Sequence, residues 1–184
     1  MKIILFLLLT FSFSCNKIST DDSLEIILND EIVEIYLIKS LNDIRGYCID
    51  MSGYKTDADI TKPLQAHSCY SYQGKISVDQ GFNESKIIEE EFYIPFFNVC
   101  MEVEKIEKSS KLLLNKCSKN SNQKFILNTD GRIQPKLNSN LCLTISDEFR
   151  EGGGGNPVHL IRNLSIEECN NNLSILQTWG IRKN

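Results

Sequence analysis

The residues with the clearest chemical potential lie in the segment RGYCIDMSGYKTDADITKPLQAHSCYSYQGKISVDQGF, residues 45–82. It contains Cys48 and Cys69, an acid at Asp50, and the closing triplet Gln80-Gly81-Phe82. On a strand, Cys48 and Asp50 would point to the same face, so a disulfide would help to fix where the acid projects. A carboxylate held in this way can accept two charge-assisted hydrogen bonds from adjacent hydroxyl groups.

Few residues suggest catalysis or metal binding. The two histidines, His67 and His159, lie outside any nucleophile motif such as Gly-x-Ser-x-Gly. No Cys-x-x-Cys occurs, which argues against zinc and redox sites. The glycine run 152–155 lacks the strand-loop-helix surroundings of a phosphate-binding loop. We therefore expect a protein that is not an enzyme and needs no metal or cofactor, although the many carboxylates leave glycoside hydrolysis open.

The charge of the chain excludes one class of partner. A net charge of −4 and a pI near 5.3 do not provide the basic stripe that binds a nucleic-acid backbone. Hydrophobic residues make up 41% and charged residues 24% of the 184 residues, as in a folded globular protein. We expect no nucleic-acid partner.

The N-terminal sequence MKIILFLLLTFSFSC has the proportions of a signal peptide. Its apolar stretch is too short to span a bilayer, and small residues precede Cys15 where cleavage would occur. The sequence around Cys15 also resembles a bacterial lipobox, with Ser12 where leucine is usual. We expect a signal peptide at 1–14, a polar tether at 15–31, and either secretion or a surface lipoprotein anchored to the membrane through Cys15.

Export changes the meaning of the remaining cysteines. Without Cys15 the chain has six, an even set suited to disulfides in an oxidising compartment. Six cysteines allow fifteen connectivities, and sequential pairing gives the shortest loops and three equal units. This scheme predicts the disulfides Cys48–Cys69, Cys100–Cys117 and Cys142–Cys169.

Short apolar runs broken by turn residues predict an all-β domain over residues 32–182. Strands are expected at 32–38, 46–51, 75–78, 91–97, 111–115, 123–127, 141–145 and 157–161. Helical periodicity never persists, and residues 100–114 are the best helical competitor.

The chain also repeats itself. The pattern Gln-x-aromatic occurs at Gln80, Gln123 and Gln177, each time after one of the proposed cysteine pairs. Three units, at about 32–85, 86–128 and 129–182, are too small to bury their own apolar faces, so we expect them to close around one shared core. The aromatic residue of each triplet would fill that core.

This template, Cys-x-Asp followed by Leu-Gln and Gln-x-aromatic, resembles the ricin B-type lectin domain, a β-trefoil of three QxW repeats. The resemblance covers nearly all of residues 32–182. It implies a non-catalytic carbohydrate-binding protein whose partners are glycans with galactose-like or related sugars. In that family an aspartate takes sugar hydroxyls and an aromatic ring stacks on the sugar.

The first unit matches that family's sugar site best. By resemblance, the carbohydrate-binding residues are Asp50, Gln65, His67, Asp79 and Gln80. His67 stands where tryptophan is usual, and Asp79 replaces an asparagine. A histidine stacks over less area, so one of three tyrosines could supply another platform: Tyr54, Tyr70 or Tyr72.

The other two units depart further from the template. The second has Glu102, Leu113 and Asn115 at the three sugar positions, although Asn122 and Gln123 are intact. The third has Thr144 in place of the acid, and we assign His159 and Ile161 to its remaining positions. The alternative function is therefore a degenerate trefoil that binds protein through its loops and binds no sugar. The oligomeric state stays open.

Overall fold

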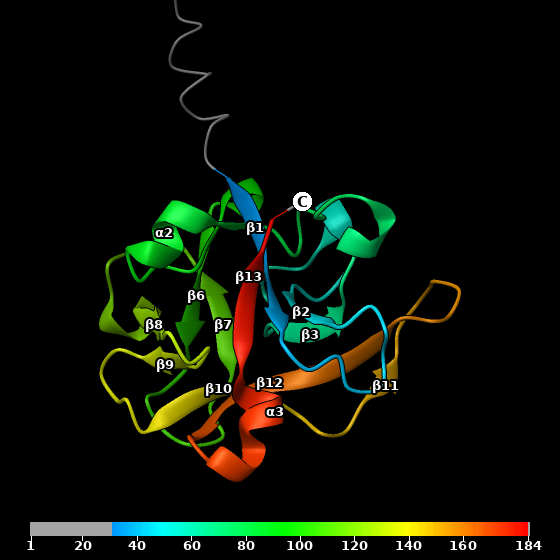
Figure 1. Cartoon of the computed structure of the whole chain (residues 1–184). Helices are drawn as coiled ribbons and strands as arrows, with labels where there is room; N and C mark the ends of the chain where they lie inside the picture. Colours follow the sequence, from blue (N-terminus) through cyan, green and yellow to red (C-terminus); the bar gives the residue numbers. More distant parts are fainter. Residues whose placement is uncertain (1–30, 184) are drawn as a thin grey trace, which may run out of the picture.

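Short apolar runs separated by glycine, asparagine and serine form strands throughout residues 31–183, the part of the chain that the computed structural model describes (Figure 1). The all-β fold expected from the sequence is confirmed. The expected signal peptide, Cys15 and the tether up to residue 30 lie outside the described residues. Within residues 31–183, no helix is both long and apolar enough to cross a membrane.

Each repeat contributes four strands. Those of the first repeat are β1 (Ile32–Leu37), β2 (Tyr47–Asp50), β3 (Gln65–Ser68) and β4 (Phe82–Asn83). Those of the second are β5 (Tyr93–Ile94), β6 (Val99–Val103), β7 (Leu112–Asn115) and β8 (Phe125–Leu127). Those of the third are β9 (Ile133–Pro135), β10 (Leu141–Ile145), β12 (Leu160–Glu168) and β13 (Trp179–Arg182), with an additional short strand, β11 (Arg150–Glu151).

Pairing follows the same plan in each repeat. The second and third strands form antiparallel hairpins, β2–β3, β6–β7 and β10–β12. The first and last strands of the domain also pair, with Glu34 opposite Arg182 and Leu37 opposite Trp179. In Figure 1, β1 and β13 accordingly lie side by side along the middle of the molecule. Closure of the chain on itself protects edges that would otherwise be exposed.

Residues 100–114 and 75–78 are the segments whose local structure the sequence left least certain or predicted wrongly. Residues 100–114, the helical competitor, form the β6–β7 hairpin. The strand expected at 75–78 is wrong, because the amide of Gln80 donates to the carbonyl of Ser77 and closes a turn there. Helices are short: α2 (Glu84–Ile88), which is capped by the Asn83 side chain, and α3 (Ser174–Gln177).

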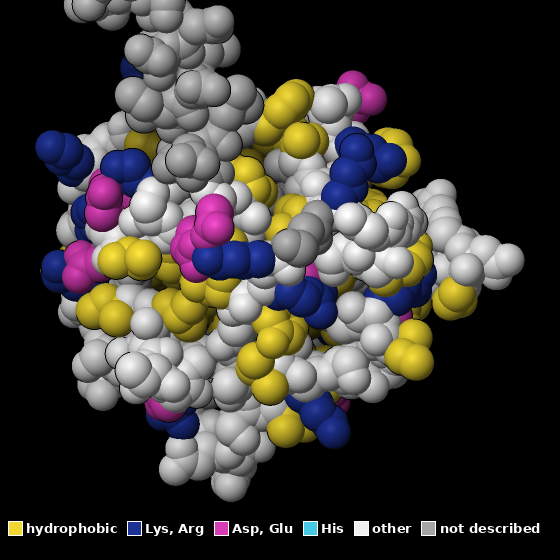
Figure 2. All heavy atoms as spheres, turned by 45° about the horizontal axis from the view of Figure 1, so that its top comes forward, with side chains coloured by type: hydrophobic (Ala, Val, Ile, Leu, Met, Phe, Trp, Pro, Cys, Tyr) yellow, Lys and Arg dark blue, Asp and Glu magenta, His cyan; other side chains and the backbone are white. Residues whose placement is uncertain are grey.

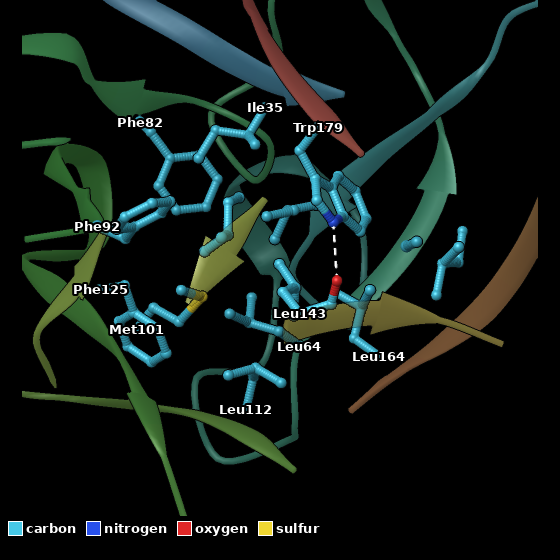
Figure 3. Packing of buried hydrophobic residues seen from close by; sticks show 14 of the residues in the cluster. Ile35, Leu64, Phe82, Phe92, Met101, Leu112, Phe125, Leu143, Leu164 and Trp179 are labelled. Carbon is cyan, nitrogen blue, oxygen red and sulfur yellow. Dashed lines mark hydrogen bonds between the residues drawn. The ribbon is translucent and has the colours of Figure 1, made fainter. Parts of the chain in front are cut away.

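The core combines apolar side chains from all three repeats, as Figure 3 shows. The aromatic residues of the three Gln-x-aromatic triplets, Phe82, Phe125 and Trp179, are 0–1% exposed. Phe92 packs edge-on between the two phenylalanines, and Trp179 donates its indole N–H to the carbonyl of Leu143 over 3.0 Å. The expected shared core is therefore present, and the one polar atom of the indole is satisfied.

Three disulfides staple the hairpins, one in each repeat. They join Cys48 to Cys69, Cys100 to Cys117, and Cys142 to Cys169, as sequential pairing predicts. The partners are 21, 17 and 27 residues apart in the chain. Loops of this length stabilise the fold by about 3 kcal/mol each in the chain-entropy model.

The surface carries charges of both signs. On the face in Figure 2, lysine and arginine side chains alternate with aspartate and glutamate and with scattered apolar groups. Lys183 illustrates the mixture, since its ammonium lies 2.9 Å from the carboxylate of Glu84. Such exposed pairs contribute little to stability.

Candidate functional site

The β2–β3 hairpin brings the predicted residues of the first repeat onto one face. Its register places Cys48 opposite His67 and Asp50 opposite Gln65. Because side chains alternate along a strand, these four share a face. The disulfide at Cys48 thus fixes the same face that carries Asp50.

The third repeat extends this face. The first half of β12 pairs with β3, with Ile161 opposite His67 and Asn163 opposite Gln65. Beyond β12, β11 places Arg150 opposite Ile161. The face is therefore a composite of two repeats that are far apart in the sequence.

A hollow of about 550 Å³ lies on this face. Residues 52–54 and the loop at residues 153–155 and 159 both contribute to its lining. Rings and polar groups line it: Tyr54, Gln65, His67, Tyr70, Arg150 and His159.

Three rings form a connected wall of the hollow. The ring centroid of His67 lies 5.2 Å from that of Tyr70 and 4.9 Å from that of His159. Burial lowers the pKa of both imidazoles below 6.5, so the rings are neutral at pH 7. Burial also raises the pKa of Tyr70, which keeps its phenol protonated. The wall is aromatic and uncharged, with the rings of His67 and Tyr70 tilted by 33° and the ring of His159 edge-on to both.

The predicted acid lies behind this wall. Asp50 is 2% exposed, and its Oδ2 accepts a hydrogen bond from Nε2 of Gln65 over 3.0 Å. Its Oδ1 is buried without a partner. Burial, followed by the charge of Asp79, raises the pKa of Asp50 well above its ordinary value. Asp50 therefore orients the amide of Gln65 and does not itself line the hollow.

Gln80 performs a structural task that recurs in every repeat. Its Oε1 accepts from the amide of Tyr70 over 3.0 Å, and its Nε2 donates to the carbonyl of Ser68 over 3.3 Å. These two residues flank Cys69. Gln123 and Gln177 join the residues that flank the second cysteine of their own repeats in the same way. The glutamines of the three triplets therefore tie each hairpin to its following turn.

Asp79 is also enclosed. It is fully buried, and Oδ2 accepts from the amide of Lys55 over 2.6 Å while Oδ1 accepts from the hydroxyl of Ser77. Of the five residues expected to contact a guest, Gln65 and His67 line the hollow, and Asp50, Asp79 and Gln80 lie behind it.

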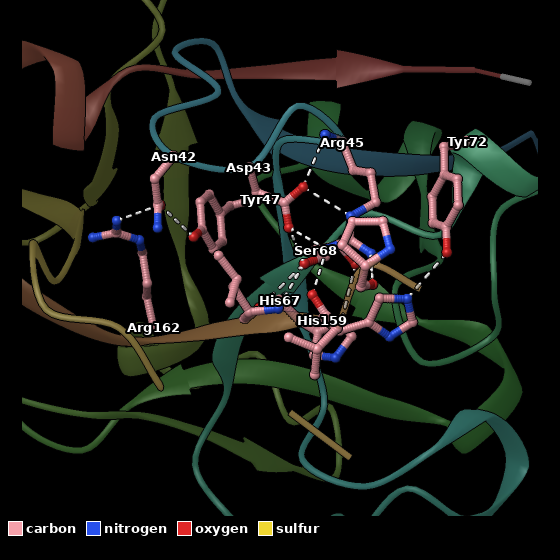
Figure 4. A network of polar contacts seen from close by, with 12 residues as sticks. Asn42, Asp43, Arg45, Tyr47, His67, Ser68, Tyr72, His159 and Arg162 are labelled. Carbon is pink, nitrogen blue, oxygen red and sulfur yellow. Dashed lines mark hydrogen bonds and ion pairs between the residues drawn. The ribbon is translucent and has the colours of Figure 1, made fainter. Parts of the chain in front are cut away.

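A buried ion pair holds the third-repeat loop over the first repeat (Figure 4). The guanidinium of Arg45 lies 2.7 Å from the carboxylate of Asp43 and donates to the carbonyls of Pro157 and Val158 over 2.8 and 2.7 Å. Asp43 also accepts from the hydroxyl of Ser68 on β3. Burial raises the pKa of Asp43, but the hydrogen bonds from Arg45 and Ser68 outweigh it and leave that pKa below its ordinary value. The loop is thus positioned by charge-assisted bonds.

The assignment of His159 and Ile161 to the third repeat is wrong. In the β10–β12 hairpin, Ser165 lies opposite Thr144 and Glu167 lies opposite Cys142, so these two hold the positions that correspond to Gln65 and His67. The third repeat has an insertion relative to the other two, and it lies between β10 and the part of β12 that pairs with it, Leu164–Glu168. His159 and Ile161 consequently line the hollow of the first repeat.

In the second repeat, the residues assigned to the three sugar positions pair as their counterparts in the first repeat do. Leu113 lies opposite Glu102 and Asn115 lies opposite Cys100. Both carboxylate oxygens of Glu102 already accept hydrogen bonds within the protein, from Nε2 of Gln123 over 2.7 Å and from Nδ2 of Asn115 over 3.1 Å. An apolar leucine where the first repeat has Gln65 removes a polar contact from this face.

Sequence reasoning did not identify Arg150. Its guanidinium donates to Oε1 of Gln65 over 2.9 Å and to Oδ1 of Asn163 over 3.0 Å. The glycine run 152–155 beside it is the nearest sequence signal, and it indicates only that the site is not a phosphate-binding loop. Within residues 31–183, the one close grouping of metal-ligand types, Glu34 with Cys48 and Cys69, has both sulfurs in a disulfide and so offers no metal site.

Comparison with known proteins gives the same architecture. The model of the ricin-type beta-trefoil lectin domain matches residues 36–160 and 92–184. A search of curated proteins finds no significant match.

Solved structures with this arrangement are distant in sequence. The Vibrio vulnificus hemolysin/cytolysin beta-trefoil lectin, solved with N-acetyl-D-lactosamine bound, is 18% identical with a TM-score of 0.54, over 84% of this chain and 95% of that one. The C-half of the earthworm R-type lectin, in complex with GalNAc, is 12% identical with a TM-score of 0.56, over 84% and 99%. A designed threefold symmetric protein, ThreeFoil, is 14% identical with a TM-score of 0.60, over 83% and 99%. At these identities the likeness shows the fold.

Proposed function

The chain belongs to the ricin-type β-trefoil lectin domain family, and we propose that it is a non-catalytic carbohydrate-binding protein whose sugar site is the hollow beside β3. The observation that carries this proposal is that one hollow is lined by both aromatic rings and a side-chain amide. Neutral rings of His67, Tyr70 and His159 form an aromatic wall in which His159 stands edge-on to the other two, and the amide of Gln65 also lines the hollow.

A sugar has both of the surfaces that this hollow matches. Its C–H face packs against a flat ring and displaces poorly held water. Its hydroxyls exchange hydrogen bonds with amide groups such as that of Gln65. Asp50 has a supporting role, because its hydrogen bond to Nε2 fixes which way that amide points.

The two imidazoles compensate for the missing tryptophan. His67 alone offers a smaller stacking surface than an indole, but His159 from the third repeat meets it edge-on at 72° and adds a second aromatic surface at an angle to the first. A single shallow site of this kind gives weak binding, so useful avidity requires several copies on a surface or in an oligomer. Galactose-like sugars are the first ligands to test, in keeping with the lactosamine and GalNAc complexes of the structural neighbours.

A glycan array with matched variants tests this function. His67→Ala and Gln65→Ala should abolish binding of any glycan that the wild type retains. Asn115→Ala is the control, because Asn115 occupies the position of His67 in the second repeat and is exposed. An array with no binding at protein concentrations near 1 mM would contradict the proposal and favour a protein-interaction module. Hydrolysis of an aryl glycoside by the wild type would contradict the non-catalytic assignment.

We also propose that the protein is exported, as a secreted protein or as a lipoprotein anchored through Cys15. Three disulfides in the described residues support an oxidising compartment. The intact mass of the mature protein tests this, since it reports the cleavage site and any acyl chains together. A mass that retains residues 1–14 would contradict export by this signal.

A further inference from the structure

The hollow contains one formally charged group. Arg150 is that group, and none of the other lining side chains is a lysine, an aspartate or a glutamate. The neighbouring acid, Glu151, pairs with Leu160 on the alternate side of β11, so it points away from Arg150. The two acids of the first-repeat site, Asp50 and Asp79, lie behind the wall and are at most 2% exposed.

Arg150 is held in place by hydrogen bonds that occupy only some of its N–H donors. A guanidinium has five N–H donors. One donates to Gln65 and one to Asn163, and among residues 31–183 the guanidinium has no other hydrogen-bond partner, which leaves three donors. Its planar fork suits a carboxylate, which can accept two parallel charge-assisted hydrogen bonds.

The glycine loop that lines the hollow leaves open space around it. A Cβ atom at Gly153 or Gly154 would meet nothing within 4 Å, so the loop is open there. The amides of Gly153, Gly154 and Gly155 donate to no acceptor among the described residues 31–183 and are available to a guest. A guest larger than a single pyranose can therefore extend between the loop and Arg150.

We infer that the hollow selects sugars that carry a carboxylate, with Arg150 as the specificity-determining residue. This inference rests on the proposed sugar site and adds the chemical class of the guest. The rings and Gln65 take the sugar ring, and the guanidinium takes the acid group. Because β11 and the glycine loop come from the insertion in the third repeat, the selectivity is a property of that insertion.

Matched sugar pairs provide the test. Methyl galactoside and methyl galacturonoside differ at C6, as an alcohol and a carboxylate, and each is titrated into the full domain while backbone amide shifts are followed by NMR. We expect the acid to bind about tenfold more tightly than the neutral sugar, the size of one charge-assisted contact. Shifts should concentrate at the glycine loop and β3. Lactose and 6′-sialyllactose form a second pair with the carboxylate on a larger guest.

Variants connect this preference to Arg150. Arg150→Gln should bring the ratio of the two affinities to about one. Loss of its hydrogen bond to Gln65 should weaken both sugars alike, so the readout is this ratio. Arg150→Lys keeps the charge but loses the fork, so it should restore part of the preference. Arg132→Gln is the control, because Arg132 lines a different hollow in the third repeat.

The possible results distinguish the carboxylate preference from the proposed sugar binding itself. Equal affinity for both members of each pair, with shifts at β3, overturns the carboxylate preference and leaves the sugar site standing. An acid preference that survives in Arg150→Gln overturns the role of Arg150. Absence of binding by every sugar overturns both the site and the inference.

Discussion

Nη2 of Arg45 donates to the carbonyl oxygen of Val158 over 2.7 Å, so a residue of the first repeat holds the inserted loop of the third. The two residues are 113 positions apart in the chain. The geometry of the hollow depends on this long-range contact as much as on the repeat that contains the family's sugar residues.

Removing Arg45 should release the loop. Arg45→Met leaves the buried carboxylate of Asp43 without its cation, which should lower the free energy of unfolding by about 3 kcal/mol. The double variant Asp43→Asn with Arg45→Met should recover much of that stability but not the loop contacts. Hydrogen exchange over residues 152–160 should therefore be faster in both variants. Wild-type exchange rates in the double variant would contradict the anchoring role.

The pKa of Asp50 gives a pH-dependent prediction. An acid whose pKa is raised on folding favours the folded state only while it is protonated, so its contribution falls as pH rises above 3.8 toward the folded-state pKa. Asp50→Asn removes this cost and keeps an acceptor for Gln65. Urea denaturation at pH 7 should show a gain of about 1–3 kcal/mol in the free energy of unfolding. The gain should vanish near about pH 3, and stability curves that stay parallel from pH 3 to 7 would refute it.

The three equivalent glutamines should be structural. Gln123→Ala leaves the amide of Ser118 and the carbonyl of Lys116 without their partner, at a cost of about 1–3 kcal/mol. Gln80→Ala and Gln177→Ala should cost similar amounts. Gln73→Ala, at an exposed position, serves as the control and should change stability by less than about 0.5 kcal/mol. Thermal or urea unfolding measures all four.

Two neighbouring glycines, Gly154 and Gly155, allow the position of the His159 ring to be tested. Gly155 has φ +91°, and a Cβ there would lie 2.7 Å from Cδ2 of His159, so Gly155→Ala should displace that ring. Gly154→Ala adds the same methyl group where nothing lies within 4 Å. Gly155→Ala should weaken glycan binding several-fold and lower Tm by about 2–5 °C, whereas Gly154→Ala should do neither. Equal effects in the two variants would show that His159 is not part of the wall.

The sequence contained strong information about the fold because the repeats are local patterns. Cysteine spacing, the Gln-x-aromatic triplets and the short apolar runs each lie within one unit, and the structure confirms the disulfides and the buried aromatic residues. The register of Glu102 with Leu113 was also predictable, since the hairpin that sets it is continuous in the chain.

The composition of the hollow was not predictable in the same way. Arg150 reaches Gln65 across 85 residues, and the template contains no position for it. His159 and Ile161 were assigned to the wrong repeat, because β12 extends beyond its hairpin with β10 and pairs there with β3. Burial of Asp50 depends on what covers it, and residue spacing fixes only the direction in which its side chain points.

Antiparallel pairing of β1 with β13 brings the start and finish of the domain to one edge. A circular permutant would therefore need only a short linker between residues 183 and 31, with new ends opened in the exposed turn at Lys108. The barrel would trace the same path in space from a different starting point, and the trefoil could be inserted into a surface loop of another protein without stretching either partner.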